Sequence, residues 1–148
     1  MTVAAVDRDA ELLGWTGLLR QEWQRLNSWH FGGRLTNPTI EFARLEPGTT
    51  ADYGRPNGIP AMRFSLATIE GVPFLSREFG TSLRRVRLLE TTRHELCHQA
   101  ADELYGYPPT GDQDLDHGNY GFRLACATIG IPASTCAAAW TYREWPCP

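Results

Sequence analysis

Three of the chain's four histidines, His94, His98 and His117, fall within residues 93–122. His94 and His98 are four positions apart, so on a helix their imidazoles share one face and can bind a single metal ion. Glu95 lies between them and completes the pattern HExxH. In this pattern the glutamate does not bind the metal but takes a proton from the water that attacks the substrate. The spacing therefore predicts a Zn2+ site with Glu95 as the general base.

A catalytic zinc ion takes three protein ligands and keeps one position open. His117 follows His98 by 19 residues, beyond a break at Gly106, and this length allows the chain to reverse and return to the metal. We expect His117 to be the third ligand, at the start of a new helix, with Asp114 and Asp116 as the alternatives.

The acidic loop before His117 resembles the opening of a calcium-binding loop, because Asp112, Asp114 and Asp116 alternate with other residues. Calcium loops need glycine at the sixth position and glutamate at the twelfth. Those positions are His117 and Arg123 here, so the pattern argues against calcium. We expect the aspartates to be solvated or to orient a histidine ligand.

The two histidines of HExxH need a helix, and residues 82–105 predict a long one. This segment has no proline or glycine, and its apolar residues recur at helical spacing until Gly106 stops the helix. A shorter helix is predicted from His117 to about Ile129. Near the N-terminus, apolar residues three or four positions apart predict an amphipathic helix from Arg8 to about His30.

Short strands are predicted between the first helix and the long one. Residues 39–45 read as one strand, and residues 51–69 read as two strands around the turn Pro56-Asn57-Gly58. Residues 70–80 are predicted to be a loop, and residues 133–148 are predicted to add a last helix. The chain is thus predicted to be a single α+β domain over residues 1–148, with a small, mostly antiparallel sheet.

The composition is that of an ordinary soluble globular protein, since 42% of the 148 residues are hydrophobic and 21% are charged. The net charge of -3 gives no overall attraction to nucleic acid. No apolar run reaches the roughly 18 residues of a membrane span, and the N-terminus lacks the cationic start of a secretory signal. We therefore expect a cytoplasmic protein.

All 14 basic residues are arginine, and four of them fall close together on the predicted long helix: Arg84, Arg85, Arg87 and Arg93. We interpret this arginine cluster as a solvated helix face, with contact to DNA phosphates as the alternative.

The four cysteines form no CxxC pair, which argues against a zinc ribbon. We expect Cys97, inside the HExxH segment, to pack as a small apolar residue. Cys126, Cys136 and Cys147 are expected to be reduced thiols, with a disulfide between two of them as the alternative.

Three blocks of the sequence resemble the SprT-like (Spartan-related) zinc metallopeptidase family. The first is LNSWHFGGRLTNPTIEF (26–42), which is similar to the family's helix end F-G-G-x-L followed by P-x-I and a strand. The second is DYGR (52–55), close to the family's A-G-R strand. The third joins HELCH (94–98) to HGNYGF (117–122), like the family's HExxH and later H-G-x-x-F. The resemblance carried by these blocks extends over residues 12–130.

The resemblance implies a zincin-like fold in which His94, His98 and His117 bind zinc and Glu95 is the general base. It also implies proteolysis and, in Spartan-like members, cleavage of proteins bound or crosslinked to DNA. Two features differ from the family pattern. The aromatic residue after the third histidine is shifted by one position, with Gly121 in its place, and the C-terminal zinc ribbon of many bacterial relatives has no counterpart.

Three hypotheses about function follow. The first is a zinc endopeptidase whose protein or peptide substrate lies extended beside the strand at Ala61–Thr68, with Tyr105, Tyr120 or Arg55 steadying the oxyanion. The second is a DNA-associated protease that uses the arginine cluster. The third is a non-catalytic, zinc-stabilised binding module, against which the intact Glu95 argues, because a structural site needs no base.

Overall fold

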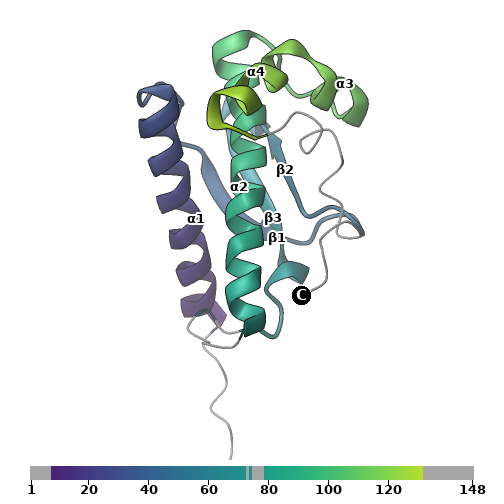
Figure 1. Ribbon diagram of the computed structural model, residues 1–148. Coiled ribbons are helices and arrows are strands. Elements are labelled where there is room, and N and C mark those ends of the chain that lie inside the picture. The colour runs from purple at the N-terminus through teal and green to yellow at the C-terminus, as the bar shows by residue number, and fades with distance from the viewer. Residues whose placement is uncertain (1–7, 73, 75–78, 132–148) are drawn as a thin grey trace, which may run out of the picture.

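The computed structural model describes residues 8–72, 74 and 79–131, with side chains from residue 83 onward in the last segment (Figure 1). It has the predicted α+β architecture, in which one helix precedes a three-stranded sheet and three helices follow it. The helix expected within residues 133–148 lies outside the described residues. The elements in chain order are α1 (Arg8–Phe31), β1 (Thr39–Ala43), β2 (Ala51–Gly54), β3 (Ala61–Ser65), α2 (Phe79–Tyr105), α3 (Gln113–Gly118) and α4 (Tyr120–Ile129).

Helix α1 confirms the amphipathic helix predicted near the N-terminus. Its buried face carries large apolar side chains at the predicted spacing. The helix ends at Gly32 and Gly33, whose φ angles of 61° and 73° are rarely adopted by other residues. The buried apolar residues of α1 are Trp15, Leu19, Trp23, Leu26 and Phe31.

The sheet has the strand order β1-β3-β2 and is mixed. Strands β2 and β3 are antiparallel, as predicted, because the short connection around Pro56–Gly58 reverses the chain between them. Strand β3 then inserts beside β1 and runs parallel to it, with Thr39 opposite Ala61. The expectation of a mostly antiparallel sheet is therefore wrong for the β1–β3 pair, and β3 is the central strand.

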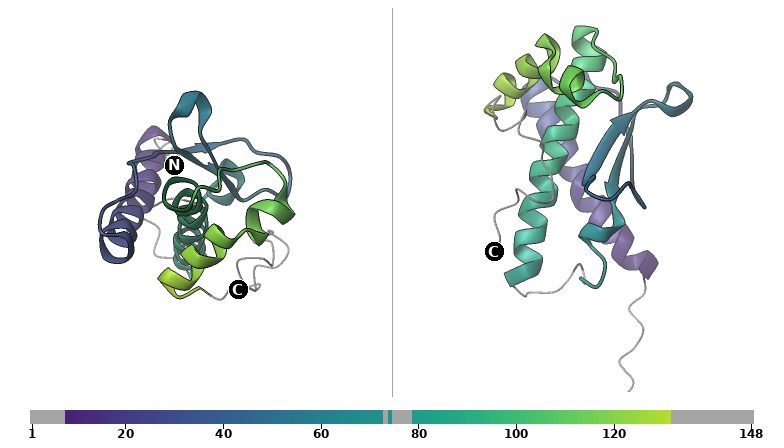
Figure 2. Two further views of the ribbon diagram at one scale, coloured as in Figure 1. Left: turned by 90° about the horizontal axis from the view of Figure 1, so that it is seen from above. Right: turned by 90° about the vertical axis from the view of Figure 1, so that its right-hand side faces the viewer.

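Helix α2 lies at the centre of the molecule and confirms the predicted long helix. Helices α1 and α2 lie side by side on one face of the sheet, and α4 crosses the C-terminal end of α2 (Figures 1 and 2). This packing buries small and apolar side chains of α2, including Cys97, as expected for that cysteine. The fully buried or nearly fully buried residues of α2 include Leu88, Leu96, Cys97, Ala100 and Ala101.

The single helix predicted from His117 to Ile129 is instead two helices, α3 and α4, separated at Asn119. Asn119 has extended backbone angles (φ -72°, ψ 156°), and its side chain caps α4 by accepting a hydrogen bond from the Phe122 amide at 2.7 Å. Asp112 caps α3 in the same way through the amides of Asp114 and Leu115. His117 therefore lies in the last turn of α3, not at the start of a longer helix.

Candidate metal centre

The three histidines predicted as ligands converge on one point. The Nε2 atoms of His94 and His117 are 3.0 Å apart, and that of His98 lies 3.2 Å from each of them. Zinc–nitrogen bonds of ~2.1 Å at tetrahedral angles separate two ligand nitrogens by about 3.4 Å. Among the described residues, these three imidazoles form the group that could hold a metal ion.

The orientation of His117 is fixed by its own helix. Its Nδ1 lies 2.8 Å from the carbonyl oxygen of Gln113, one turn earlier in α3. Because a carbonyl oxygen only accepts, Nδ1 carries the proton and Nε2 keeps its lone pair. That lone pair points at His94 and His98, which is the arrangement a ligating histidine needs.

Phe122 forms the floor beneath the three imidazoles. It is fully buried in α4 and stacks on the His98 ring, with ring centres 4.4 Å apart and an angle of 25° between the planes. The rings of His94 and His117 meet it edge-on at 5.4 Å and 5.3 Å. Phe122 thus provides the aromatic contact to the histidines, although it comes one position later in the sequence than the aromatic residue of the family pattern.

Gly121 allows α4 to approach the end of α2. A Cβ atom at this position would lie 2.6 Å from the Tyr107 ring and 2.9 Å from Tyr105 Cβ, closer than real carbon contacts. The glycine therefore sets the distance between α4 and α2, and with it the position of Phe122 under the histidines. In the sequence, the signal for this close approach was the position of Gly121 in the HGNYGF block.

The two histidines of α2 are neutral, the form that binds metal. Burial and the neighbouring His98 and His117 hold the pKa of His94 well below its ordinary value of 6.5. Burial and His117 likewise lower the pKa of His98 to about 3, against a small opposing effect of Asp116.

The Glu95 side chain is buried beside His94, with an exposed fraction of 4%. Burial raises its pKa to about 8, and the nearby Asp52 carboxylate adds to the effect. No hydrogen bond or ion pair from the described residues reaches its carboxylate, so both oxygens are available for chemistry. A cation held by the three imidazoles would favour the charged carboxylate, which is the form of a general base.

The histidines and Glu95 open onto a cleft of about 930 Å³, which we call the metal cleft. One wall is the loop 47–50 and strand β2 as far as Tyr53. The opposite wall is the loop before α3, together with α3 itself. Asp116 lines this wall, but its carboxylate accepts hydrogen bonds from Thr110 and Gly111, which fold the loop. The group that could hold a metal includes His117 and neither Asp114 nor Asp116.

The oxyanion candidates chosen from the sequence lie away from the metal cleft. Arg55 donates to the Asp102 carboxylate and the Gly58 carbonyl, each at 3.1 Å, and neither Tyr105 nor Tyr120 lines the cleft. The basic side chain in the described lining is Arg123 of α4, which is exposed. Sequence reasoning missed Arg123 because its approach depends on the turn between α3 and α4.

The expected substrate strand, Ala61–Thr68, is also wrong. Strand β3 is paired on both sides, with β1 and with β2, so its backbone has no free edge. Strand β2 is an edge of the sheet, and its residues Ala51, Asp52 and Tyr53 line the metal cleft. The sheet edge at the metal cleft is therefore β2.

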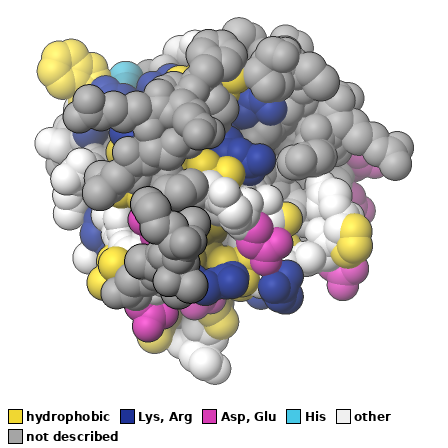
Figure 3. Space-filling model, turned by 90° about the horizontal axis from the view of Figure 1, so that it is seen from below, with side chains coloured by type: hydrophobic (Ala, Val, Ile, Leu, Met, Phe, Trp, Pro, Cys, Tyr) yellow, Lys and Arg dark blue, Asp and Glu magenta, His cyan; other side chains and the backbone are white. Residues whose placement is uncertain are grey.

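Arginines of the cluster make contacts with neighbouring segments of the protein. Arg84 donates to the Thr68 carbonyl, Arg85 donates to a backbone carbonyl and lies over an aromatic ring, and Arg93 bonds to Glu22 at 3.2 Å. On the face drawn in Figure 3, the described basic side chains are interspersed with acidic and apolar ones.

The cysteines only partly match the expectation. Cys97 is a buried free thiol, which confirms that it packs as a small apolar residue, and burial raises its pKa. Cys126 is disulfide-bonded, so the expected reduced thiol is wrong for this residue. Cys136 and Cys147 lie outside the described residues.

Comparison with known protein families, with characterised proteins and with solved structures found no match for this chain. The resemblance to SprT-like metallopeptidases therefore depends on the three sequence blocks. In the part of the chain that the structure describes, no helix combines the length and apolar character needed to cross a bilayer.

Proposed function

We propose that this protein is a zinc-dependent endopeptidase of the SprT-like kind. The observation that carries the proposal is the convergence of three Nε2 atoms beside a buried, unbonded glutamate at the floor of an open cleft. A structural zinc site needs neither an accessible cleft nor a carboxylate held next to the ligands.

His94, His98 and His117 would hold the zinc ion. A zinc ion in such a site acts as a Lewis acid and brings the pKa of a bound water to ~7. The Glu95 carboxylate takes the proton of the attacking water and passes it to the departing amide nitrogen. The position of Glu95 supports this role: its carboxylate lies buried beside His94, and a zinc ion held there would favour the charged form that accepts the proton.

The substrate is a protein segment in extended conformation, paired with the free edge of β2. Backbone pairing accepts many sequences, because it uses amide and carbonyl groups common to all residues. Arg123 lies in the cleft with its charge available, and it is suited to contact a substrate carbonyl oxygen.

The decisive experiment compares cleavage by wild type and Glu95→Gln on an unfolded protein such as casein. We expect the variant to keep one zinc per chain and to lose roughly 10²–10⁴-fold in kcat, as for removal of a general base. Glu90→Gln is the matched control, because it makes the same chemical change on α2 outside the described cleft lining.

Two results would contradict the proposal in different ways. Cleavage by Glu95→Gln at the wild-type rate would remove the assigned mechanism. If the wild type instead holds one zinc tightly but cleaves no unfolded protein, the remaining hypothesis is a zinc-stabilised binding module.

A further inference from the structure

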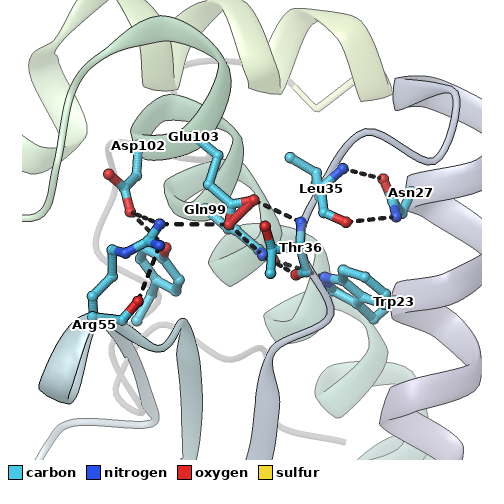
Figure 4. Close-up of polar contacts among 10 residues, drawn as sticks. Trp23, Asn27, Leu35, Thr36, Arg55, Gln99, Asp102 and Glu103 are labelled. Atoms are coloured by element: carbon cyan, nitrogen blue, oxygen red, sulfur yellow. Dashed lines mark hydrogen bonds and ion pairs between the residues drawn. The ribbon is translucent and has the colours of Figure 1, made fainter.

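Helix α2 carries a second set of polar side chains just beyond His98. Gln99 and Glu103 bond to α1 and the segment before β1, whereas Asp102 bonds to β2 and the residue after it (Figure 4). None of the three lines the metal cleft, and none is needed to bind the ion. The hydrogen-bond partners of these three residues show which segments they fasten to α2.

Asp102 holds strand β2. Its Oδ2 accepts a hydrogen bond from the Tyr53 hydroxyl at 2.7 Å and another from Arg55 Nη1 at 3.1 Å. Arg55 also donates to the carbonyl of Gly58, in the turn between β2 and β3. Burial and the Asp102 carboxylate raise the pKa of Tyr53, so its hydroxyl stays protonated and donates. We call Tyr53, Arg55 and Asp102 the β2 tether.

Gln99 and Glu103 hold a different part of the protein. Gln99 accepts from Trp23 Nε1 at 2.8 Å and donates to the Thr36 carbonyl at 2.6 Å. Glu103 accepts from the Thr36 amide at 2.6 Å. These bonds fasten α1 and the segment before β1 to α2 (Figure 4). They provide a natural comparison, because they also tie another segment to α2 but involve no residue of β2. The two sets meet where Arg55 approaches Glu103 at 3.7 Å.

The β2 tether matters because β2 is an edge strand. Among the described residues β2 pairs only with β3, so the ladder fixes one side of β2 while the other side faces the metal cleft. Asp102 follows His98 by four residues and therefore lies one helical turn along α2. The bond from Tyr53 to Asp102 thus sets the distance between β2 and the helix that carries two of the histidines.

We propose that Tyr53 and Asp102 are positioning residues, which hold β2 at the separation from the metal ligands that places a bound peptide against Glu95. The inference rests on the proposed endopeptidase function. A peptide paired with β2 inherits the position of that strand, and a strand that is already held in place loses less conformational entropy when the peptide binds. A loosened β2 weakens productive binding without changing the ligands or the base.

The test is Tyr53→Phe, which removes one hydroxyl and leaves the ring. We expect KM for a quenched fluorogenic peptide long enough to lie along β2 to rise roughly threefold to tenfold, the effect of one lost hydrogen bond. Zinc content and kcat at saturating peptide stay at wild-type values. In hydrogen exchange followed by mass spectrometry, the β2 segment exchanges faster than in the wild type.

Trp23→Phe is the control, because it also removes one side-chain hydrogen bond to α2, but on the side of α1. We expect it to lower thermal stability while KM and β2 exchange stay unchanged. An unchanged KM in Tyr53→Phe, or an equal rise in both variants, overturns the inference. If the wild type cleaves no peptide, the proposed endopeptidase function is wrong, whatever the role of Tyr53. Hydrogen exchange then still tests the β2 tether, because unaltered exchange of β2 in Tyr53→Phe would show that Tyr53 does not hold the strand.

Discussion

The direction in which each imidazole faces decides whether three histidines make a metal site. His94 and His98 face the same side of α2 because they are four residues apart, and this spacing can be read directly from the sequence. His117 is directed by a bond to the Gln113 carbonyl within a helix of six residues. The first pair was therefore predictable from spacing, while the third ligand could only be proposed among alternatives.

Replacing the third ligand tests the site directly. We expect His117→Ala to reduce zinc affinity by more than the roughly 10–100-fold typical of residues that only support a ligand. The measurement is metal content after dialysis, together with a competitive zinc titration. Asp114→Asn is the control and should keep its zinc, since Asp114 is not among the residues that could hold the ion. Full zinc retention in His117→Ala, with loss in Asp114→Asn, would make an aspartate the ligand.

At the scale of elements, helices were easier to predict than their arrangement. Both long helices were found because apolar spacing and glycine stops are local signals. The parallel pairing of β1 with β3 depends on contacts between distant segments, and the break at Asn119 depends on a single capping side chain. The β2 tether and the approach of Arg123 were missed for the same reason, because each requires the assembled fold.

The junction of α4 with α2 gives a prediction at this scale. We expect Gly121→Ala to lower the free energy of unfolding by about 1–3 kcal/mol, because its methyl group overlaps Tyr107 and Tyr105 and must push α4 away. Zinc affinity should fall as well, since Phe122 moves with α4. Thermal denaturation and zinc titration measure the two effects.

The control for this variant is Gly17→Ala. No atom lies within 4 Å of a Cβ atom added at this position of α1. Alanine should therefore stabilise the helix by roughly 0.5–1 kcal/mol and leave the metal centre unchanged. Equal behaviour of the two variants would show that the close approach of α4 is unimportant.

At the scale of the whole molecule, α2 is the central support of the candidate centre. It carries two ligands and the base, and α1, the sheet and α4 pack around it. The arginines near its start contact neighbouring segments, and the net charge of the chain is -3. Both observations disfavour a phosphate-binding surface on α2.

We therefore expect weak or undetectable binding to DNA. The measurement is a fluorescence-anisotropy titration of labelled double-stranded DNA at two salt concentrations, because phosphate contacts weaken steeply as salt rises. Tight binding at low salt that falls with added salt would restore the DNA-associated protease as the better hypothesis. Arg84→Ala would then show whether the arginine cluster is responsible.

The shortness of α3 bears on how the centre is assembled. Six residues are too few for a helix to persist without outside support, and α3 depends on its Asp112 cap and on the loop closed by Asp116. The two histidines of α2, by contrast, stand on the longest helix in the described chain. Metal affinity is therefore expected to depend on the folding of α3 as well as on the ligands, and loss of the Asp112 cap should weaken metal binding although Asp112 is not a ligand.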